Sequence, residues 1–130
     1  TSQSVAREMI KKRSGKIINI SSINGVIGSD ERASYTASKA GVINLTRTLA
    51  AEWAEYGINI NAIGPTYLLT PLTKSLFENE DFKEKYFERQ PIQRIGRPED
   101  ILGAVIYLAS SASDLVTGHT LMVDGGWTAV

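Results

Sequence analysis

The chain of 130 residues is 42% hydrophobic and 22% charged, which is the composition of an ordinary globular domain. Fourteen basic residues balance fourteen acidic ones, so no net charge is present to attract nucleic acid or an anionic membrane. The lack of cysteine and the single histidine, His119, exclude disulfides and a zinc site. No apolar run reaches the roughly 18 residues of a membrane span, and the first residues lack a signal-peptide pattern, so we expect a cytoplasmic protein.

The first half of the chain predicts a helix, a strand, a second helix and a second strand. Apolar residues recur at helical spacing over 1–12, and the β-branched run at 16–20 is typical of a buried strand. A long helix follows over 34–56, and the run at 58–63 predicts the next strand. The apolar residues that share one face of the long helix are Val42, Leu45, Leu49 and Trp53.

The second half begins with an ambiguous region over 66–97, which contains two short helical patterns, at 72–77 and 81–89. Pro98, followed by two acidic residues, is typical of a helix start and predicts a helix over 98–110. A last short strand is expected at 120–123.

This order of elements indicates an α/β fold. Two successive strand–helix–strand units predict three adjacent parallel strands with helices on both faces, which is half of a doubly wound sheet. An open parallel sheet binds ligands beyond the carboxyl ends of its strands. Chemistry is therefore expected just after Ile20 and Ile63, with the segment after Val123 as a third candidate.

Three polar residues are predicted to meet at that edge of the sheet. Ser22 follows the first strand, while Tyr35 and Lys39 lie one helical turn apart, so the Lys39 ammonium can lie beside the Tyr35 phenol. A cation favours the phenolate form of tyrosine, which suits proton exchange with a substrate oxygen that the serine holds by a hydrogen bond. Such a set fits the interconversion of a carbonyl and an alcohol. By spacing alone, a surface Tyr–Lys pair and a turn serine are equally good interpretations.

The sequence resembles the short-chain dehydrogenase/reductase superfamily in segments that follow the family's order along the whole chain. The matching segments are 15–22, 35–41, 59–65, 97–101, 116–118 and 123–127. The resemblance implies a Rossmann fold and an oxidoreductase that depends on NAD or NADP. It also implies that Ser22, Tyr35 and Lys39 are the catalytic residues.

The same resemblance implies a set of cofactor contacts. The residues it assigns to cofactor binding are Tyr35, Lys39, Pro65, Leu68 and Thr70. The lysine would hold the nicotinamide ribose, Leu68 would offer backbone contacts and Thr70 a hydroxyl group. Thr66 stands where members of the family usually have glycine.

One half of the family pattern has no counterpart in these 130 residues. The glycine-rich strand-to-helix turn that receives the pyrophosphate is missing. We therefore expect residues 1–130 to form the C-terminal catalytic half of a single Rossmann-type domain, with 66–97 as a substrate lid and the N-terminal dinucleotide-binding half absent. Alone, this chain is expected to be inactive.

The lid region suggests a substrate class. The segments 87–92 and 124–129 look most like the gluconate 5-dehydrogenase branch, which acts on sugar acids, and the alternative is the 3-oxoacyl-acyl-carrier-protein reductase branch. Apolar residues that could close over a small-molecule substrate are Leu68, Leu69, Leu72, Leu76, Phe77, Phe82, Tyr86 and Phe87. Cations that could include a partner for a substrate carboxylate are Lys74, Lys83, Lys85, Arg89 and Arg94.

A catalytically silent interaction module is the alternative from another class. In the family, the helix that matches 34–56 packs against a second subunit, so the resemblance implies a homodimer or homotetramer through this helix and the C-terminal strand. Small residues that would permit close helix approach are Ala37, Ala40, Ala50 and Ala51. A pure interaction module has no need for the serine, tyrosine and lysine together, which discriminates the two hypotheses.

Overall fold

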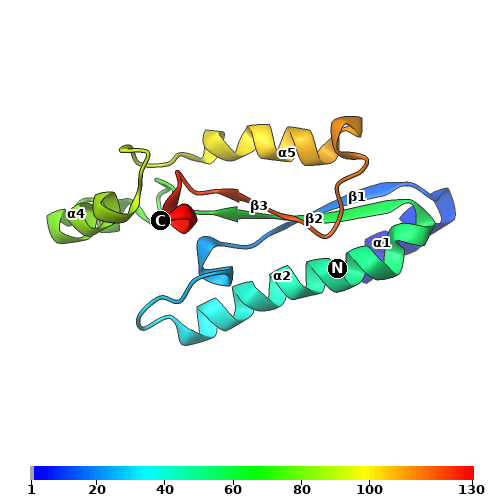
Figure 1. Cartoon of the computed structure of the whole chain (residues 1–130), viewed down its shortest axis with the longest axis horizontal. Helices are drawn as coiled ribbons and strands as arrows, with labels where there is room; N and C mark the ends of the chain where they lie inside the picture. Colours follow the sequence, from blue (N-terminus) through cyan, green and yellow to red (C-terminus); the bar gives the residue numbers. More distant parts are fainter. Residues whose placement is uncertain (1) are drawn as a thin grey trace.

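The computed structural model describes residues 2–130 and contains a parallel sheet with helices on both faces (Figure 1). Its strands, in spatial order, are β1 (Gly15–Ile20), β2 (Ile58–Pro65) and β3 (Thr120–Val123). Both neighbouring pairs are parallel, and Ile63 lies opposite Ile20 on one side and Leu121 on the other. The prediction of three adjacent parallel strands is confirmed.

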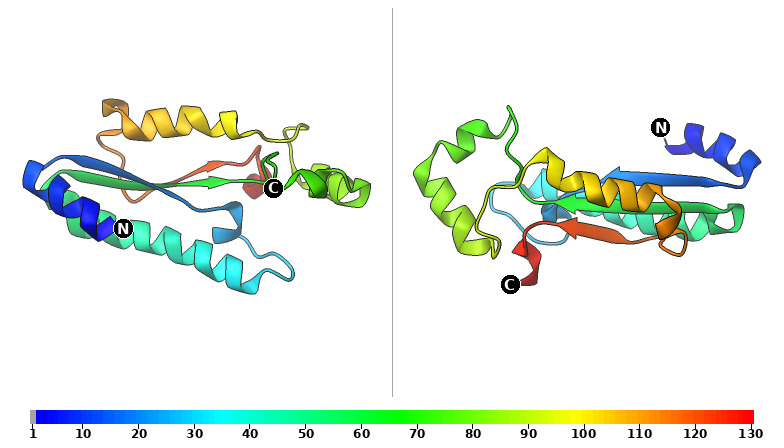
Figure 2. Two further views of the ribbon diagram at one scale, coloured as in Figure 1. Left: turned by 180° about the vertical axis from the view of Figure 1, so that it is seen from behind. Right: turned by 90° about the horizontal axis from the view of Figure 1, so that it is seen from above.

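Helices cover the two faces of this sheet (Figures 1 and 2). α1 (Ser2–Lys12) and α2 (Ala33–Trp53) lie on one face, and α5 (Leu102–Ala109) lies on the other. Short 3-10 turns continue α2 over Ala54–Tyr56 and precede α5 over Pro98–Ile101. α2 and α5 each connect one strand to the next parallel strand, as crossover helices do.

The predicted lid lies beyond the carboxyl ends of the strands, at the left of Figure 1. It contains α3 (Lys74–Phe77) and α4 (Glu80–Arg89), which correspond to the two short helical patterns of the sequence. The Asn79 side chain accepts a hydrogen bond from the Phe82 N–H and so caps the start of α4. The lid is therefore next to the edge where open parallel sheets bind ligands.

α2 packs on the sheet with a face that partly overlaps its apolar stripe, since Leu49 and Trp53 of the stripe pack on the core from partly buried positions. The α2 residues that are buried are Ile43, Thr46 and Ala50. By contrast, Leu45 of the stripe is 49% exposed. Ala50 packs with Ile58 and Ile60 of β2, so this alanine belongs to the core and offers no surface to a second helix.

Thr46 shows why the buried face escaped the hydrophobic pattern. Its hydroxyl donates to the Val42 carbonyl at 2.8 Å and accepts from the Asn19 side-chain amide of β1 at 2.9 Å. Because both hydrogen-bonding functions are satisfied, a polar residue can occupy a fully buried helix position.

Two features are absent from residues 2–130. No helix there is both long and apolar enough to cross a bilayer. No three His, Cys, Asp or Glu side chains gather there as they would around a metal ion.

Asn61 of β2 holds the segment that leads into β3. Its side chain is almost fully buried; Nδ2 donates to the Val116 carbonyl at 2.8 Å, and Oδ1 accepts from the His119 N–H at 3.0 Å. Asn59 supports the same segment from a less buried position by donating to the Asp114 and Val116 carbonyls. The two asparagines therefore fix the entry into the last strand.

We expect Asn61→Leu to lower the free energy of unfolding of the complete natural protein by about 1–3 kcal/mol, because it removes both hydrogen bonds of the buried Asn61 side chain and leaves the His119 N–H without its side-chain acceptor. Asn44→Leu, on the exposed side of α2, is the control and should change it by no more than about 0.5 kcal/mol. Urea unfolding of both variants measures the difference. Equal effects of the two substitutions would contradict the role given to Asn61.

Candidate active site

A cleft of about 640 Å³ lies at the carboxyl ends of β1 and β2. Its walls come from the end of β1, the start of α2, the segment after β2, and α3. The sequence-predicted site residues that line it are Ser22, Tyr35, Lys39, Pro65, Leu68 and Thr70. The fold thus brings all six to one cavity, although they come from separate parts of the chain.

Ser22 is held in the cleft wall by the turn that follows β1. It lies directly before the short 3-10 turn Ile23–Gly25, and its hydroxyl oxygen accepts a hydrogen bond from the Asn24 N–H at 3.2 Å. The side chain is largely buried. Because Oγ acts as the acceptor in this contact, the hydroxyl proton can be donated to an oxygen in the cleft.

Tyr35 and Lys39 reach the same cleft from the first two turns of α2. The Lys39 ammonium lies 5.7 Å from the centre of the Tyr35 ring and donates to the Ile20 carbonyl, at the end of β1, at 3.2 Å. The lysine is therefore anchored to the strand and stays near the phenol. Tyr35 is 41% exposed, so its hydroxyl is accessible to a small molecule.

Ser21 connects the end of β1 to α2 next to Ser22 in the sequence. Its N–H donates to the Ile63 carbonyl at 2.8 Å, and its hydroxyl donates to the Lys39 carbonyl at 2.9 Å. Gly25 makes this approach possible, because a Cβ there would lie 2.8 Å from Ser21 Oγ and 3.0 Å from the Lys39 carbonyl oxygen. The sequence alone does not reveal this role of Ser21, because a serine after a strand carries no sign of a distant acceptor.

Thr73 organises the segment that follows β2. Its hydroxyl donates to the Leu68 carbonyl and accepts from the Thr70 N–H at 2.9 Å, while the two threonine hydroxyls lie 3.0 Å apart. One side chain therefore orients both residues that the resemblance assigned to the cofactor. No motif marked Thr73, because its role depends on the path of the chain and not on spacing.

Thr66 has an ordinary backbone at its position, although its buried hydroxyl has no hydrogen-bond partner. Its N–H donates to the Val123 carbonyl at 3.3 Å, which extends the pairing of β2 with β3. Among the described residues, those outside glycine with a positive φ are Arg13 and Glu31, so Thr66 has an ordinary backbone conformation. A glycine is therefore not required here, although the family usually has one.

The apolar residues predicted to close over a substrate divide into three groups. Those that line the cleft are Leu68, Leu72 and Leu76. Those that pack on one another and on Tyr67 or Trp127 are Phe77, Phe82 and Tyr86. Those that line a second cavity are Leu69 and Phe87. Burial in the aromatic group raises the pKa of Tyr86, and this group forms the core of the lid instead of a substrate contact.

The turn after β3 stabilises the lid and does not form part of the cleft. The Asp124 carboxylate accepts hydrogen bonds from the Gly126 N–H and from both the N–H and the hydroxyl of Thr128. Gly125 has φ +64°, and a Cβ there would lie 2.9 Å from the Gln90 side chain. Within the described part of the chain no residue after β3 lines this cleft, whereas Asp124, Gly125 and Gly126 line a separate cavity of about 300 Å³ that Leu68 also borders.

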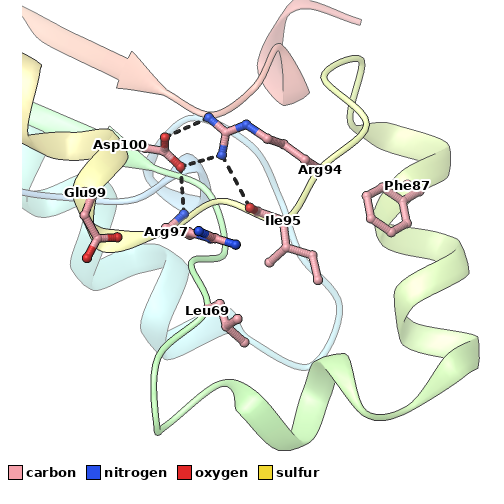
Figure 3. Close-up of a pocket in the computed structure, with 7 residues that line it drawn as sticks. All are labelled: Leu69, Phe87, Arg94, Ile95, Arg97, Glu99 and Asp100. Carbon is pink, nitrogen blue, oxygen red and sulfur yellow. Dashed lines mark hydrogen bonds and ion pairs between the residues drawn. The ribbon is translucent and has the colours of Figure 1, made fainter.

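The second cavity, of about 720 Å³, lies between the end of the lid and the start of α5 (Figure 3). Two nitrogens of Arg94 each lie 2.7 Å from an Asp100 oxygen, and the Arg97 N–H donates to the same carboxylate at 2.8 Å. The Arg94 hydrogen bonds, and then the Arg97 N–H, lower the pKa of Asp100 to about 2. This ion pair joins the end of the lid to the 3-10 turn that precedes α5, and Ser22 and Tyr35 lie in the other cavity.

The fold and the cleft together define an α/β protein with a serine, a tyrosine and a lysine at the ligand-binding edge of a parallel sheet. A family model described as enoyl-(acyl carrier protein) reductase matches residues 1–128. The chain therefore belongs to the short-chain dehydrogenase/reductase superfamily, as its motifs indicated.

Its relatives include sugar-acid dehydrogenases. The chain is 49% identical over 129 residues to the 2-dehydro-3-deoxy-D-gluconate 5-dehydrogenase of Dickeya dadantii, covering 98% of this chain and 51% of the relative. It is 44% identical to the 5-keto-D-gluconate 5-reductase of Escherichia coli, covering 96% and 49%. These relatives match the predicted gluconate 5-dehydrogenase-like branch. The chain spans about half the length of the curated relatives it matches.

A solved structure agrees in fold over the same half. The gluconate 5-dehydrogenase from Burkholderia cenocepacia, in complex with NADP and tartrate, has a TM-score of 0.96 and 43% identity to this chain. The alignment covers 99% of this chain and 51% of that protein. The predicted Rossmann-type half sheet is therefore confirmed.

We expect Arg94→Gln to raise the pKa of Asp100 from about 2 towards its ordinary value, because it removes the largest cause of the shift. A carboxylate with a lowered pKa stabilises the folded state above its unfolded pKa, and this contribution is lost as the pH falls through about 2. In the variant this contribution should be smaller, and its loss should be complete at a higher pH, because the folded-state pKa lies closer to the unfolded one. Carbon-13 NMR titration of the Asp100 carboxyl group measures the pKa directly.

Arg97→Gln is the control for this titration. It leaves the backbone N–H that donates to Asp100 and removes only a weaker, through-space charge. The pKa of Asp100 should therefore stay close to 2 in Arg97→Gln. An equal rise in both variants would refute the role of the Arg94 side chain in lowering the pKa of Asp100.

Proposed function

We propose that this chain is the catalytic part of an NAD(P)-dependent oxidoreductase that interconverts an alcohol and a ketone on a small polar substrate such as a sugar acid. The observation that carries the proposal is the convergence of Ser22, Tyr35 and Lys39 on one cleft at the carboxyl edge of the sheet. A catalytically silent interaction module would have no need of this convergence.

The three side chains have complementary roles in this proposal. The Ser22 hydroxyl donates a hydrogen bond to the substrate oxygen and holds it beside the Tyr35 hydroxyl. Tyr35 then donates its proton to that oxygen during ketone reduction and accepts a proton from it during alcohol oxidation. Lys39, fixed to the Ile20 carbonyl near the phenol ring, stabilises the negative charge that develops on the tyrosine oxygen.

The residues of the cleft fit the nicotinamide end of a dinucleotide. Tyr35, Lys39 and Thr70 offer polar groups, whereas Pro65 and Leu68 offer apolar side chains, and all five line one cavity. When bound, the nicotinamide supplies or accepts the hydride of the reaction. We propose that the lysine contacts its ribose, that Thr70 contacts its carboxamide side, and that Leu68 contributes backbone contacts. Both NAD and NADP are consistent with these groups.

The relatives support a sugar acid as the substrate. Two of them are named for keto- and deoxy-gluconates, and the Burkholderia cenocepacia enzyme was solved with NADP and tartrate, which is a hydroxy acid. A 3-oxoacyl-acyl-carrier-protein reductase would use the same serine, tyrosine and lysine. The sugar-acid substrate is favoured because the branch that the sequence resembles is also the branch of these relatives.

Three further expectations remain part of the proposal. Residues 1–130 would form the C-terminal catalytic half of one Rossmann-type domain with 66–97 as its lid, and these residues alone would not turn over substrate. The complete protein would form a homodimer or homotetramer through α2 and the C-terminal strand. In the cell it would act in the cytoplasm.

In the complete natural protein, we expect Tyr35→Phe to lower kcat by roughly 10²- to 10⁴-fold, because the ring remains and the proton donor is lost. Lys39→Met should also lower kcat and weaken cofactor binding. Tyr107→Phe is the matched control, since Tyr107 is similarly exposed, at 39%, but lies on α5 away from the cleft. Steady-state reduction of 5-keto-D-gluconate with NADH and with NADPH measures these effects. Near-normal turnover by Tyr35→Phe would rule out the assigned role.

We expect Thr73→Val to weaken NAD(P)H binding by about 10-fold, because valine keeps the shape but leaves the Leu68 carbonyl and the Thr70 N–H without their partner. Thr48→Val, at an exposed position of α2, should leave the affinity unchanged. Titration of cofactor fluorescence measures both dissociation constants. A Thr73→Val affinity equal to that of the control would show that Thr73 does not position the cofactor-binding segment.

A further inference from the structure

The cleft has an unbalanced charge. Among the described residues that line it, the charged ones are Arg32 and Lys39, and both are positive. Lys39 is anchored to the Ile20 carbonyl beside the Tyr35 phenol. A cavity bounded by low-dielectric protein with two cations and no carboxylate in its wall attracts an anionic ligand. Lys39 already has a role in proton transfer, whereas Arg32 has no role in that step.

Arg32 is placed in the cleft by the turn that starts α2. It is the residue directly before the helix, three positions ahead of Tyr35, and Glu31 before it adopts a left-handed backbone with φ +57°. Its guanidinium carbon lies 5.5 Å from the centre of the Tyr67 ring, in the segment after β2. The aromatic face supports the guanidinium plane, while its N–H groups, which lie at the edge of that plane, can still donate hydrogen bonds.

The lid cations that the sequence analysis considered as partners of a substrate carboxylate lie outside the cleft, unlike Arg32. Lys74 and Lys83 form ion pairs with glutamates of the lid, and Arg94 pairs with Asp100 in the second cavity. None of the five cations predicted from the lid lines the cleft. Within residues 2–130, Arg32 forms no ion pair, although it is partly buried.

We propose that Arg32 binds the carboxylate of the substrate and so makes the site selective for keto-acids and hydroxy-acids of the sugar series. The inference rests on the proposed function and deepens it by naming the group that recognises the acid. Arginine suits this role because its planar fork donates two parallel hydrogen bonds to a carboxylate. Tyr35 would meet the reacting oxygen while Arg32 holds the acid end of the same molecule.

The test uses the complete natural protein and a matched pair of ketones. 5-Keto-D-gluconate carries a carboxylate, whereas L-sorbose has the same carbon skeleton and ketone with a hydroxymethyl group in place of that carboxylate. Arg32→Gln should raise KM for 5-keto-D-gluconate by roughly 10- to 100-fold with little change in kcat, because a charge-assisted binding contact is lost. The kcat/KM for L-sorbose should be the same in Arg32→Gln and in the natural protein.

Two controls separate recognition of the acid from a structural role. Arg32→Lys keeps the charge and should recover part of the loss on 5-keto-D-gluconate. Arg47→Gln removes an exposed arginine of α2 and should leave both substrates unaffected. The NADPH dissociation constant, measured by fluorescence, should be unchanged by Arg32→Gln.

The outcomes distinguish this inference from the function on which it rests. A KM for 5-keto-D-gluconate within twofold of the natural value, an equal loss on L-sorbose, or a parallel loss of NADPH binding would overturn the role of Arg32 while the oxidoreductase function stands. If the natural protein reduces neither ketone with NADH or NADPH, the proposed function fails and the role of Arg32 fails with it.

Discussion

The parallel pairing of β1 with β2 is the constraint on which the rest of the structure depends. Because Ile20 lies opposite Ile63, both strands end at the same edge, and the chain leaves each of them towards the cleft. Ser22 follows one strand and the segment that Thr73 organises follows the other. A register shift of one residue would turn the strand side chains to the opposite face and move Ser22 away from Tyr35.

Two small contacts convert this alignment into a site of defined geometry. Ser21 ties the end of β1 to the carbonyl of Lys39, and the Lys39 ammonium returns to the carbonyl of Ile20. Two hydrogen bonds therefore connect the end of β1 to Lys39 of α2, one donated from each element, close to Ser22. Precise placement of proton donors requires such support, because small displacements of a reacting group reduce catalysis strongly.

The sequence predicted the sheet because its strands are compact β-branched runs between strong helix and turn signals. It also singled out Ser22, Tyr35 and Lys39, since a strand end and a four-residue helical step are local patterns. It did not find the roles of Thr46, Thr73 and Arg32, because each depends on a partner distant in sequence or on the path of a loop. The lid aromatic residues show the same limit: apolar character alone does not separate Phe77, in the lid core, from Leu76, in the cleft wall.

The connectivity of the sheet also has a consequence for how the chain reaches this structure. Gly15 pairs with Ile58, and Ala62 pairs with Thr120. A crossover helix and its loops separate the two strands of each pair in the sequence, so neither pair can form from local contacts. Pairings between such distant residues have a large loop-closure entropy cost and form slowly, whereas the 21-residue α2 forms from local contacts. β2 lies between β1 and β3, and its interior is almost continuously buried. During synthesis its apolar residues therefore stay without β3 until residues 120–123 have been made, and over that interval they are open to non-native contacts.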